Sequence, residues 1–166
     1  MIQKSSNSLS TVTNIRFGSL EMTDLWWNVN NIVIPSISLS PPEMSVRAGT
    51  AAIGAPDTVD YSELSVDLIV DKEWIAFDNA YEYFLNGLDV ESGKFSHYKK
   101  FDLWAEIVDE MGNTIKKFWF YNCRLTEISG LIVSPTSSED EIQTFSLSFK
   151  VTYFKYETPG KKYLPS

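Results

Sequence analysis

Two stretches of the sequence alternate apolar and polar side chains with a period of two residues. Residues 64–70 place Leu64, Val66 and Leu68 between polar neighbours, and residues 145–153 repeat the pattern over a longer distance. Only an extended strand sends successive side chains to opposite faces, so both stretches predict half-buried β-strands. The second is expected to be one uninterrupted strand, the longest regular strand in the chain. The sequence therefore predicts a sheet with one face on an apolar core.

The remaining patterns add further strands and a single helix. Apolar and aromatic side chains recur at three- and four-residue intervals over residues 72–86, which predicts an amphipathic helix with its aromatic stripe on the core. Asp71 is expected to cap its start, and Asn86-Gly87 to end it. Further strands are expected at residues 14–20, at 25–34 with a bulge or turn at the asparagines, in a hairpin over 101–121, and at 128–134. The predicted fold class is mainly β with one helix, an antiparallel sandwich or barrel.

The segment of residues 43–61 interrupts this regularity. It contains Gly49, Gly54 and Pro56 among small side chains, and it predicts a long, loosely packed hairpin or loop. A docking role and a plain mobile loop are both open at this point. Residues 1–13 are rich in Ser, Asn and Thr and predict a flexible N-terminal arm. We expect one domain over residues 14–157, followed by a C-terminal tail over 158–166.

The titratable residues argue against several classes of chemistry. The net charge is −8, and residues 1–93 carry 4 Lys and Arg against 13 Asp and Glu, so no basic footprint for gripping phosphates is expected. Cys123 and His97 are the single cysteine and histidine, which argues against a zinc site or a Cys–His pair. Glycine-rich phosphate motifs are absent from the sequence, as is an apolar run long enough to span a bilayer. We predict no catalytic, cofactor-binding or metal-binding residue, no membrane contact and no enzymatic activity.

The C-terminal third carries a resemblance to a known family. The run FYNCRLTEI at residues 120–128 is followed, after a spacer, by DEIQTF at residues 140–145 and a strand ending in Tyr153-Phe154. This order resembles the tail-tube protein family of contractile, T4-type phages, together with its baseplate hub and tail completion relatives. The match covers about forty residues, and the order of the earlier elements is similar.

The resemblance implies a fold of the phage tail-tube type and a structural virion protein that forms or caps the inner tail tube. It implies a homo-oligomer, six-membered in the family, whose rings stack and let DNA pass without specific binding. Expected partners are adjacent rings and the sheath, tape-measure and baseplate proteins, in a tail assembled in the host cytoplasm. The segment of residues 43–61 is then the ring-stacking loop, with Val46, Arg47, Ile53, Asp57 and Val59 as its candidate contact residues.

Other functions remain open at this point. A tube-like protein of a type VI secretion system or of another contractile injection system is expected to share the fold. Outside that class, a monomeric β-sandwich binding module would use residues 43–61 as a ligand loop. A hydrolase using scattered carboxylates would need a pocket that contains a paired Asp or Glu with a shifted pKa.

Overall fold

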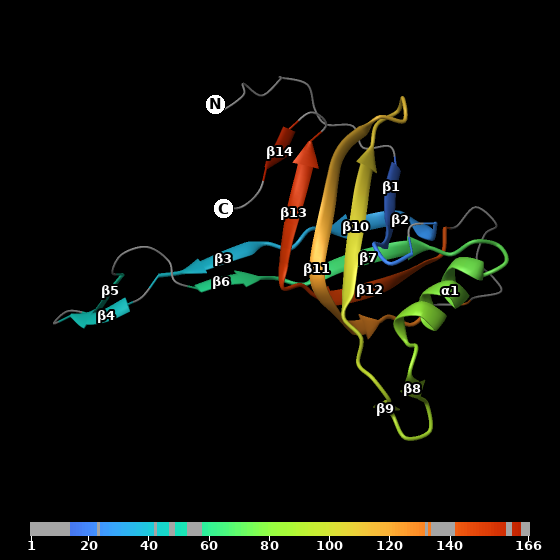
Figure 1. The fold of residues 1–166 in the computed structure, drawn as a ribbon, viewed down its shortest axis with the longest axis horizontal. Coiled ribbons are helices and arrows are strands. Elements are labelled where there is room, and N and C mark those ends of the chain that lie inside the picture. The colour runs from blue at the N-terminus through green and yellow to red at the C-terminus, as the bar shows by residue number, and fades with distance from the viewer. Residues whose placement is uncertain are drawn as a thin grey trace.

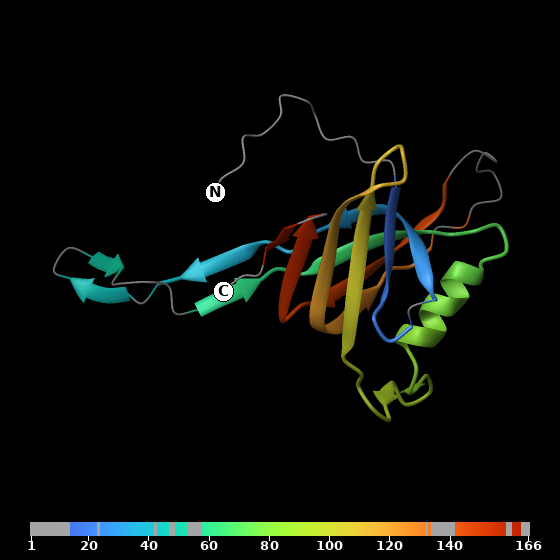
Figure 2. The same ribbon diagram turned by 45° about the horizontal axis from the view of Figure 1, so that its top comes forward.

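A computed structural model describes residues 14–22, 24–41, 43–46, 49–52, 58–131, 133, 142–158 and 161–163. The fold is a β-barrel with one helix, and a hairpin projects far from one side of it (Figures 1 and 2). The N-terminal arm predicted for residues 1–13 lies outside the described residues. The elements are β1 Asn14–Ser19, β2 Trp26–Val33, β3 Ile37–Ser40, β4 Glu43–Val46, β5 Gly49–Ala52, β6 Thr58–Tyr61, β7 Leu64–Ile69, α1 Ile75–Phe84, β8 Leu88–Asp89, β9 Lys94–Phe95, β10 Phe101–Val108, β11 Thr114–Ile128, β12 Thr144–Lys150, β13 Tyr153–Thr158 and β14 Lys161–Tyr163.

The main sheet has eight strands in the order β10-β1-β2-β7-β12-β11-β13-β14, and β10 also pairs with β11. This extra pairing closes the strands from β10 to β11 into a barrel, and β13 and β14 extend the sheet from β11. All the pairings in the sheet are antiparallel, as the sequence predicts. In Figure 1, β1, β10, β11 and β13 form a front layer that crosses β2, β7 and β12 behind it.

The barrel interior is filled by the alternating apolar positions. Leu64, Val66 and Leu68 of β7 are fully buried, as are Phe145, Leu147 and Phe149 of β12 or nearly so. The strand faces predicted for these two stretches are therefore confirmed. Phe17 of β1, Trp27 of β2, Leu103 of β10 and Phe120 of β11 complete the core from the other strands.

The expected uninterrupted strand over residues 145–153 is wrong. The strand is interrupted at Val151 and Thr152. As a result, β12 pairs with the second half of β11, and β13 pairs with the first half. Thr152 holds this crossing by donating its backbone N–H to the oxygen of Tyr121 at 3.3 Å. The alternation shifts by one residue there, and Phe154 is buried where Tyr153 had been expected. The longest strand is instead β11, with 15 residues and a left-handed residue, Asn122 (φ 49°), where its partner changes.

The helix is real but shorter than predicted. α1 begins at Ile75 and not at residue 72, because Trp74 adopts a left-handed conformation (φ 63°) and serves as the N-cap residue without a side-chain bond. Asp71 still caps the helix from outside, since its Oδ1 accepts the N–H of Ala76 at 2.8 Å. Gly87 (φ 89°) follows the C-terminus, as expected. The helix lies across one end of the barrel (Figures 1 and 2).

Other expectations have mixed outcomes. The 101–121 hairpin is confirmed, with its turn held by Asp109, and β2 has the expected bulge, a register shift between Val29 and Asn31. The strand expected over residues 128–134 is wrong for the described part of that stretch, because β11 ends at Ile128. Within the segment assigned to the tail, Lys161–Tyr163 pairs with β13 as β14.

Candidate assembly surfaces

The hairpin that projects from the barrel has one apolar and one polar face at its base. β3 and β6 pair antiparallel, with Ile37 opposite Tyr61 and Leu39 opposite Val59. Because side chains alternate along a strand, these four residues share one face. Three of them remain half exposed: Ile37 at 51%, Leu39 at 57% and Val59 at 49%. We call Ile37, Leu39 and Val59 the hairpin patch; such a row of large apolar side chains on a thin projection is unusual for a surface that faces only water.

The base of the hairpin is anchored firmly to the barrel. The Tyr61 ring meets Phe154 edge to face, with centroids 5.6 Å apart. The backbone N–H of Ser62 donates to the oxygen of Ser36 at 3.0 Å, and the N–H of Ser36 donates to Ser62 Oγ at 2.7 Å. The direction of the projection is therefore set by contacts with β13 and by a short ladder, and it is not left to the loop itself.

Two of the five candidate stacking residues lie among the described residues of this projection. Val46 ends β4 and Val59 lies in β6, whereas Arg47, Ile53 and Asp57 lie outside the described residues. β4 pairs with β5, so much of the segment predicted as a hairpin or loop is ribbon. The structure brings Val59 together with Ile37 and Leu39, two residues that the sequence did not single out. The short alternation at residues 37 and 39, just before Pro41-Pro42, was the signal available for them.

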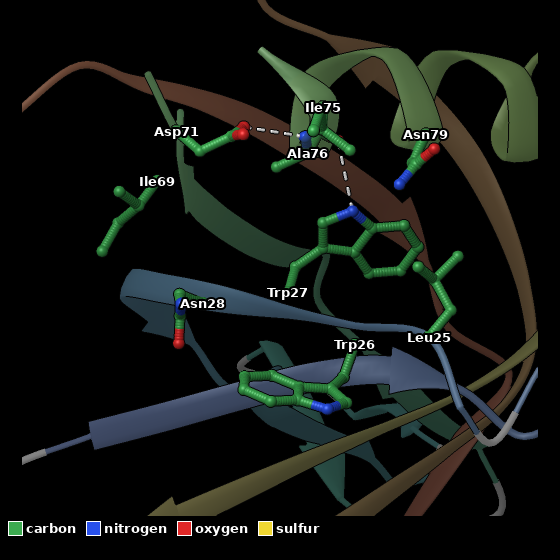
Figure 3. Close-up of a pocket in the computed structure, with 9 residues that line it drawn as sticks. All are labelled: Leu25, Trp26, Trp27, Asn28, Ile69, Asp71, Ile75, Ala76 and Asn79. Carbon is green, nitrogen blue, oxygen red and sulfur yellow. Dashed lines mark hydrogen bonds between the residues drawn. The ribbon is translucent and has the colours of Figure 1, made fainter. Parts of the chain in front are cut away.

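A groove runs between β2 and α1 on the side of the barrel end that carries the helix (Figure 3). One cavity of about 270 Å³ is lined by Leu25, Trp26, Trp27, Asn28, Ile69, Asp71, Ile75, Ala76 and Asn79. A second of about 250 Å³ is lined by Met22, Leu25, Asn79, Glu82, Tyr83 and Asn86. Leu25 and Asn79 line both cavities, so the two are neighbours, and we call them together the helix groove.

The sequence builds this groove from two adjacent tryptophans. Trp26 and Trp27 point to opposite sides of β2, and Figure 3 shows only Trp27 directed at the helix. Trp27 Nε1 donates to the backbone oxygen of Ala76 at 3.2 Å, and its ring lies 5.6 Å from that of Phe84. The hydrogen bond from the Ala76 N–H holds the pKa of Asp71 below its ordinary value, although partial burial opposes the shift. The backbone of Ala76 therefore fixes the wall of the groove, because its oxygen accepts from Trp27 and its N–H donates to Asp71.

The outward face of the front layer carries paired charges and aromatic rings. Arg16, Glu106, Lys117 and Glu157 are successive neighbours across β1, β10, β11 and β13, so their signs alternate along the row. Lys117 Nζ also lies 5.2 Å from the ring centroid of Trp104. Trp104 in turn lies opposite Trp119 on the neighbouring strand. Opposite charges on neighbouring strands neutralise each other. This face therefore lacks the uniform positive charge with which proteins hold phosphates.

The two residues best suited to nucleophilic chemistry are not placed for it. Burial raises the pKa of the Cys123 thiol to about 12, with a smaller contribution from the Asp102 carboxylate. The exposed His97 lies in the loop after β9, where its Nδ1 is 3.0 Å from Ser96 Oγ. Among the described residues, no group of three or more His, Cys, Asp or Glu side chains is arranged to hold a metal ion. The single described helix is too short to cross a membrane.

No family model matches the chain, and no curated protein matches its sequence. Several solved structures are similar to this chain in fold. A chain in the PVC sheath–tube complex of an extracellular contractile injection system has a TM-score of 0.65 at 13% identity, covering 92% of this chain and 93% of that one. A chain of the anti-feeding prophage baseplate has a TM-score of 0.64 at 8% identity, covering 95% and 100%. A type six secretion system protein reaches 0.59 at 13% identity, covering 87% and 83%. At identities this low, the likeness establishes the fold alone. The chain has the tail-tube fold that is found in these structures of contractile injection systems.

Proposed function

We propose that this chain is a structural virion protein that forms or caps the inner tube of a contractile phage tail. The observation that carries the proposal is the extent of the likeness to a chain of a sheath–tube complex, which covers 92% of this chain and so includes more than the barrel alone. A structural role also suits a buried, protonated Cys123.

The proposed assembly is a homo-oligomeric ring of six subunits. Closed rings are the usual outcome when every subunit uses the same two surfaces, one on each side. DNA would pass through the lumen without specific binding, and the chain's net charge of −8 supports this part of the proposal. The sheath, the tape-measure protein and the baseplate are the proposed partners, in a tail that is assembled in the host cytoplasm.

The outer part of the projecting hairpin is the proposed ring-stacking element. β4 and β5 extend beyond the β3–β6 base and away from the barrel (Figure 1), and this projection supports a contact with a neighbouring ring. Val46, Arg47, Ile53 and Asp57 belong to this outer part by sequence, and Val59 belongs to the base.

Two related roles are favoured by particular likenesses. Similarity to a baseplate chain favours a position in the hub or at the end of the tube. Similarity to a type six secretion system protein favours a tube-like subunit of such a system. All of these roles share the ring and differ in what the ring contacts.

Electron microscopy of the purified protein over a range of concentrations, with light scattering for mass, tests the proposal. We expect rings or stacked tubes whose mass is a multiple of six 18.9 kDa chains. A chain that stays monomeric at every concentration would favour the binding-module alternative and contradict the proposed self-assembly.

A second variant separates stacking from ring formation. Replacing residues 41–57 by Asn-Gly joins Ser40 to Thr58, which are already paired, through a two-residue hairpin turn. We expect single rings that no longer stack, with the barrel's melting temperature unchanged. Long tubes formed by this variant would show that residues 41–57 do not stack the rings.

A further inference from the structure

We propose that the hairpin patch of one subunit packs into the helix groove of a second copy of this chain, forming a head-to-tail contact. The inference rests on the proposed ring and names the two surfaces that join its subunits. Ile37, Leu39 and Val59 are the inserted side chains, and the space between β2 and α1 receives them.

The hairpin patch needs a cover. A two-stranded ribbon is at best marginally stable in water unless one face packs against something. β3 and β6 are such a ribbon, and beyond Tyr61 their apolar face meets no part of the core. The opposite face carries Ser38, Ser40 and Asp60, which suit water. Among the described residues, the ribbon therefore has one apolar face that is left half exposed and one polar face that suits water.

The helix groove is a matching acceptor. Its rim carries large apolar side chains that are themselves half exposed, Met22 at 42% and Ile75 at 51%, whereas the Trp26 ring points away from the helix (Figure 3). Asn79 of α1 lies beside them and supplies a neutral amide for the edge of an incoming strand. Both cavities are lined by α1 residues, Ile75 and Ala76 in the first and Glu82 and Tyr83 in the second, so the space beside the helix suits side chains spaced two residues apart along a strand.

Charge decides the orientation of the docked hairpin. The acidic groups on the groove are Asp71 and Glu82. Asp60 of the hairpin lies on the face opposite the patch, so insertion of the patch turns this carboxylate away from the groove. The reverse orientation would place like charges together and leave the patch in water, which is unfavourable on both counts.

A contact between the hairpin patch and the helix groove has to join two chains. The hairpin and α1 lie at opposite ends of the molecule in both views (Figures 1 and 2), so a chain cannot fill its own groove. A two-fold dimer would pair like surfaces. A head-to-tail contact lets every subunit donate one patch and accept another, and such contacts close into rings or continue as filaments.

Cross-linking between two single-cysteine additions tests the contact directly. Leu39→Cys and Asn79→Cys are made in separate chains, mixed and oxidised; the buried native Cys123 stays out of reach. We expect a disulfide-linked pair only in the mixture. Ser38→Cys, on the polar face of the same strand, is the matched control and should give little product with Asn79→Cys.

Charge substitutions give an independent readout. Leu39→Glu or Ile75→Glu should weaken assembly on the order of tenfold or more, as loss of a buried anchor does. Both residues are exposed in the single chain, so the circular dichroism of the subunit should not change. Ser38→Glu should leave ring formation as it is in the wild type.

The outcomes separate this inference from the proposed function. Rings that form normally with Leu39→Glu, or without any Leu39–Asn79 cross-link, would overturn the docking and leave the ring standing. A cross-link of Leu39→Cys only to itself would indicate a two-fold contact and overturn the docking too. A wild-type chain that is monomeric at every concentration would overturn both, including the case in which only a different protein fills the groove.

Discussion

Trp27 Nε1 donates a hydrogen bond to the backbone oxygen of Ala76, 3.2 Å away, and thereby ties the second strand of the barrel to the first turn of the only described helix. The same indole contacts Tyr83 and Phe84. One buried side chain thus holds both the helix and the wall of the groove beside it.

Trp27→Phe should lower the free energy of unfolding by about 1–3 kcal/mol, because it removes a buried hydrogen bond and part of a packed ring. Denaturant unfolding measures the loss, and amide exchange should show α1 opening more often than the barrel. Trp26→Phe, one residue earlier and on the exposed side of β2, is the control and should stay within about 0.5 kcal/mol of wild type. Equal effects of the two variants would show that the Ala76 contact does not hold the helix.

Gly18→Ala should destabilise the fold, because the Trp104 ring lies across β1 at this position. An added Cβ would sit 2.8 Å from a Trp104 ring atom and 2.9 Å from the backbone oxygen of Leu25. Overpacking of this kind costs about 1–3 kcal/mol. Gly130→Ala, where a Cβ meets nothing within 4 Å, is the matched control. Thermal melts of both variants test the prediction, and an unshifted midpoint for Gly18→Ala would contradict it.

Asp71→Asn should destabilise the protein at neutral pH and have a progressively smaller effect in acid. The Ala76 N–H lowers the pKa of Asp71 below 3.8, so the carboxylate stabilises the folded state above that value. The stabilisation is lost as the pH falls through the folded-state pKa. Melting midpoints of wild type and variant should therefore converge as the pH drops. Glu82→Gln, on the exposed side of the same helix, serves as the control for a general change of charge.

The Cys123 thiol should resist modification in the folded protein. Burial raises its pKa from 9.0 to about 12, so the nucleophilic thiolate is scarce and inaccessible at pH 8. An aromatic disulfide reagent should react quickly only after denaturant is added. The raised pKa contributes stability below pH 9 that is lost as the pH rises toward 12, and Cys123→Ala should remove this part of the pH dependence. Rapid labelling of the native protein would show that β11 opens near Asn122.

The sequence predicts the barrel well where one residue type decides the structure locally. Alternation alone places the side chains of β7 and β12 on the correct faces, and Asp109 with Gly112 marks the β10–β11 turn. It fails at Val151 and Thr152 because the apolar pattern continues through the break while the strand changes partner. Similarly, the start of α1 depends on the left-handed Trp74, a conformation that a bulky aromatic residue rarely adopts and that helix propensity cannot reveal.

The candidate assembly surfaces were predictable only in part. Glycines, prolines and small side chains pointed to the projecting segment and hence to Val59. The groove was not predictable, since it depends on residues from the β1–β2 connection, β2 and α1 that meet only in the folded chain. The pair Trp26-Trp27 was the one sequence signal for it, because adjacent aromatic residues on a strand must send one ring outward.

The pairing of β1 with β10 joins residues that are far apart in the sequence. Ser19 Oγ donates to the backbone oxygen of Asp102, 83 positions later, and the Ser146–Asp67 hydrogen bond spans 79 positions. Contacts so distant in sequence form slowly, and they cannot form on the ribosome until most of the chain has been made. The barrel of such a subunit therefore cannot close until β10, β11 and β12 have been made, and the rate at which the subunit becomes able to join an assembly is set by this closure.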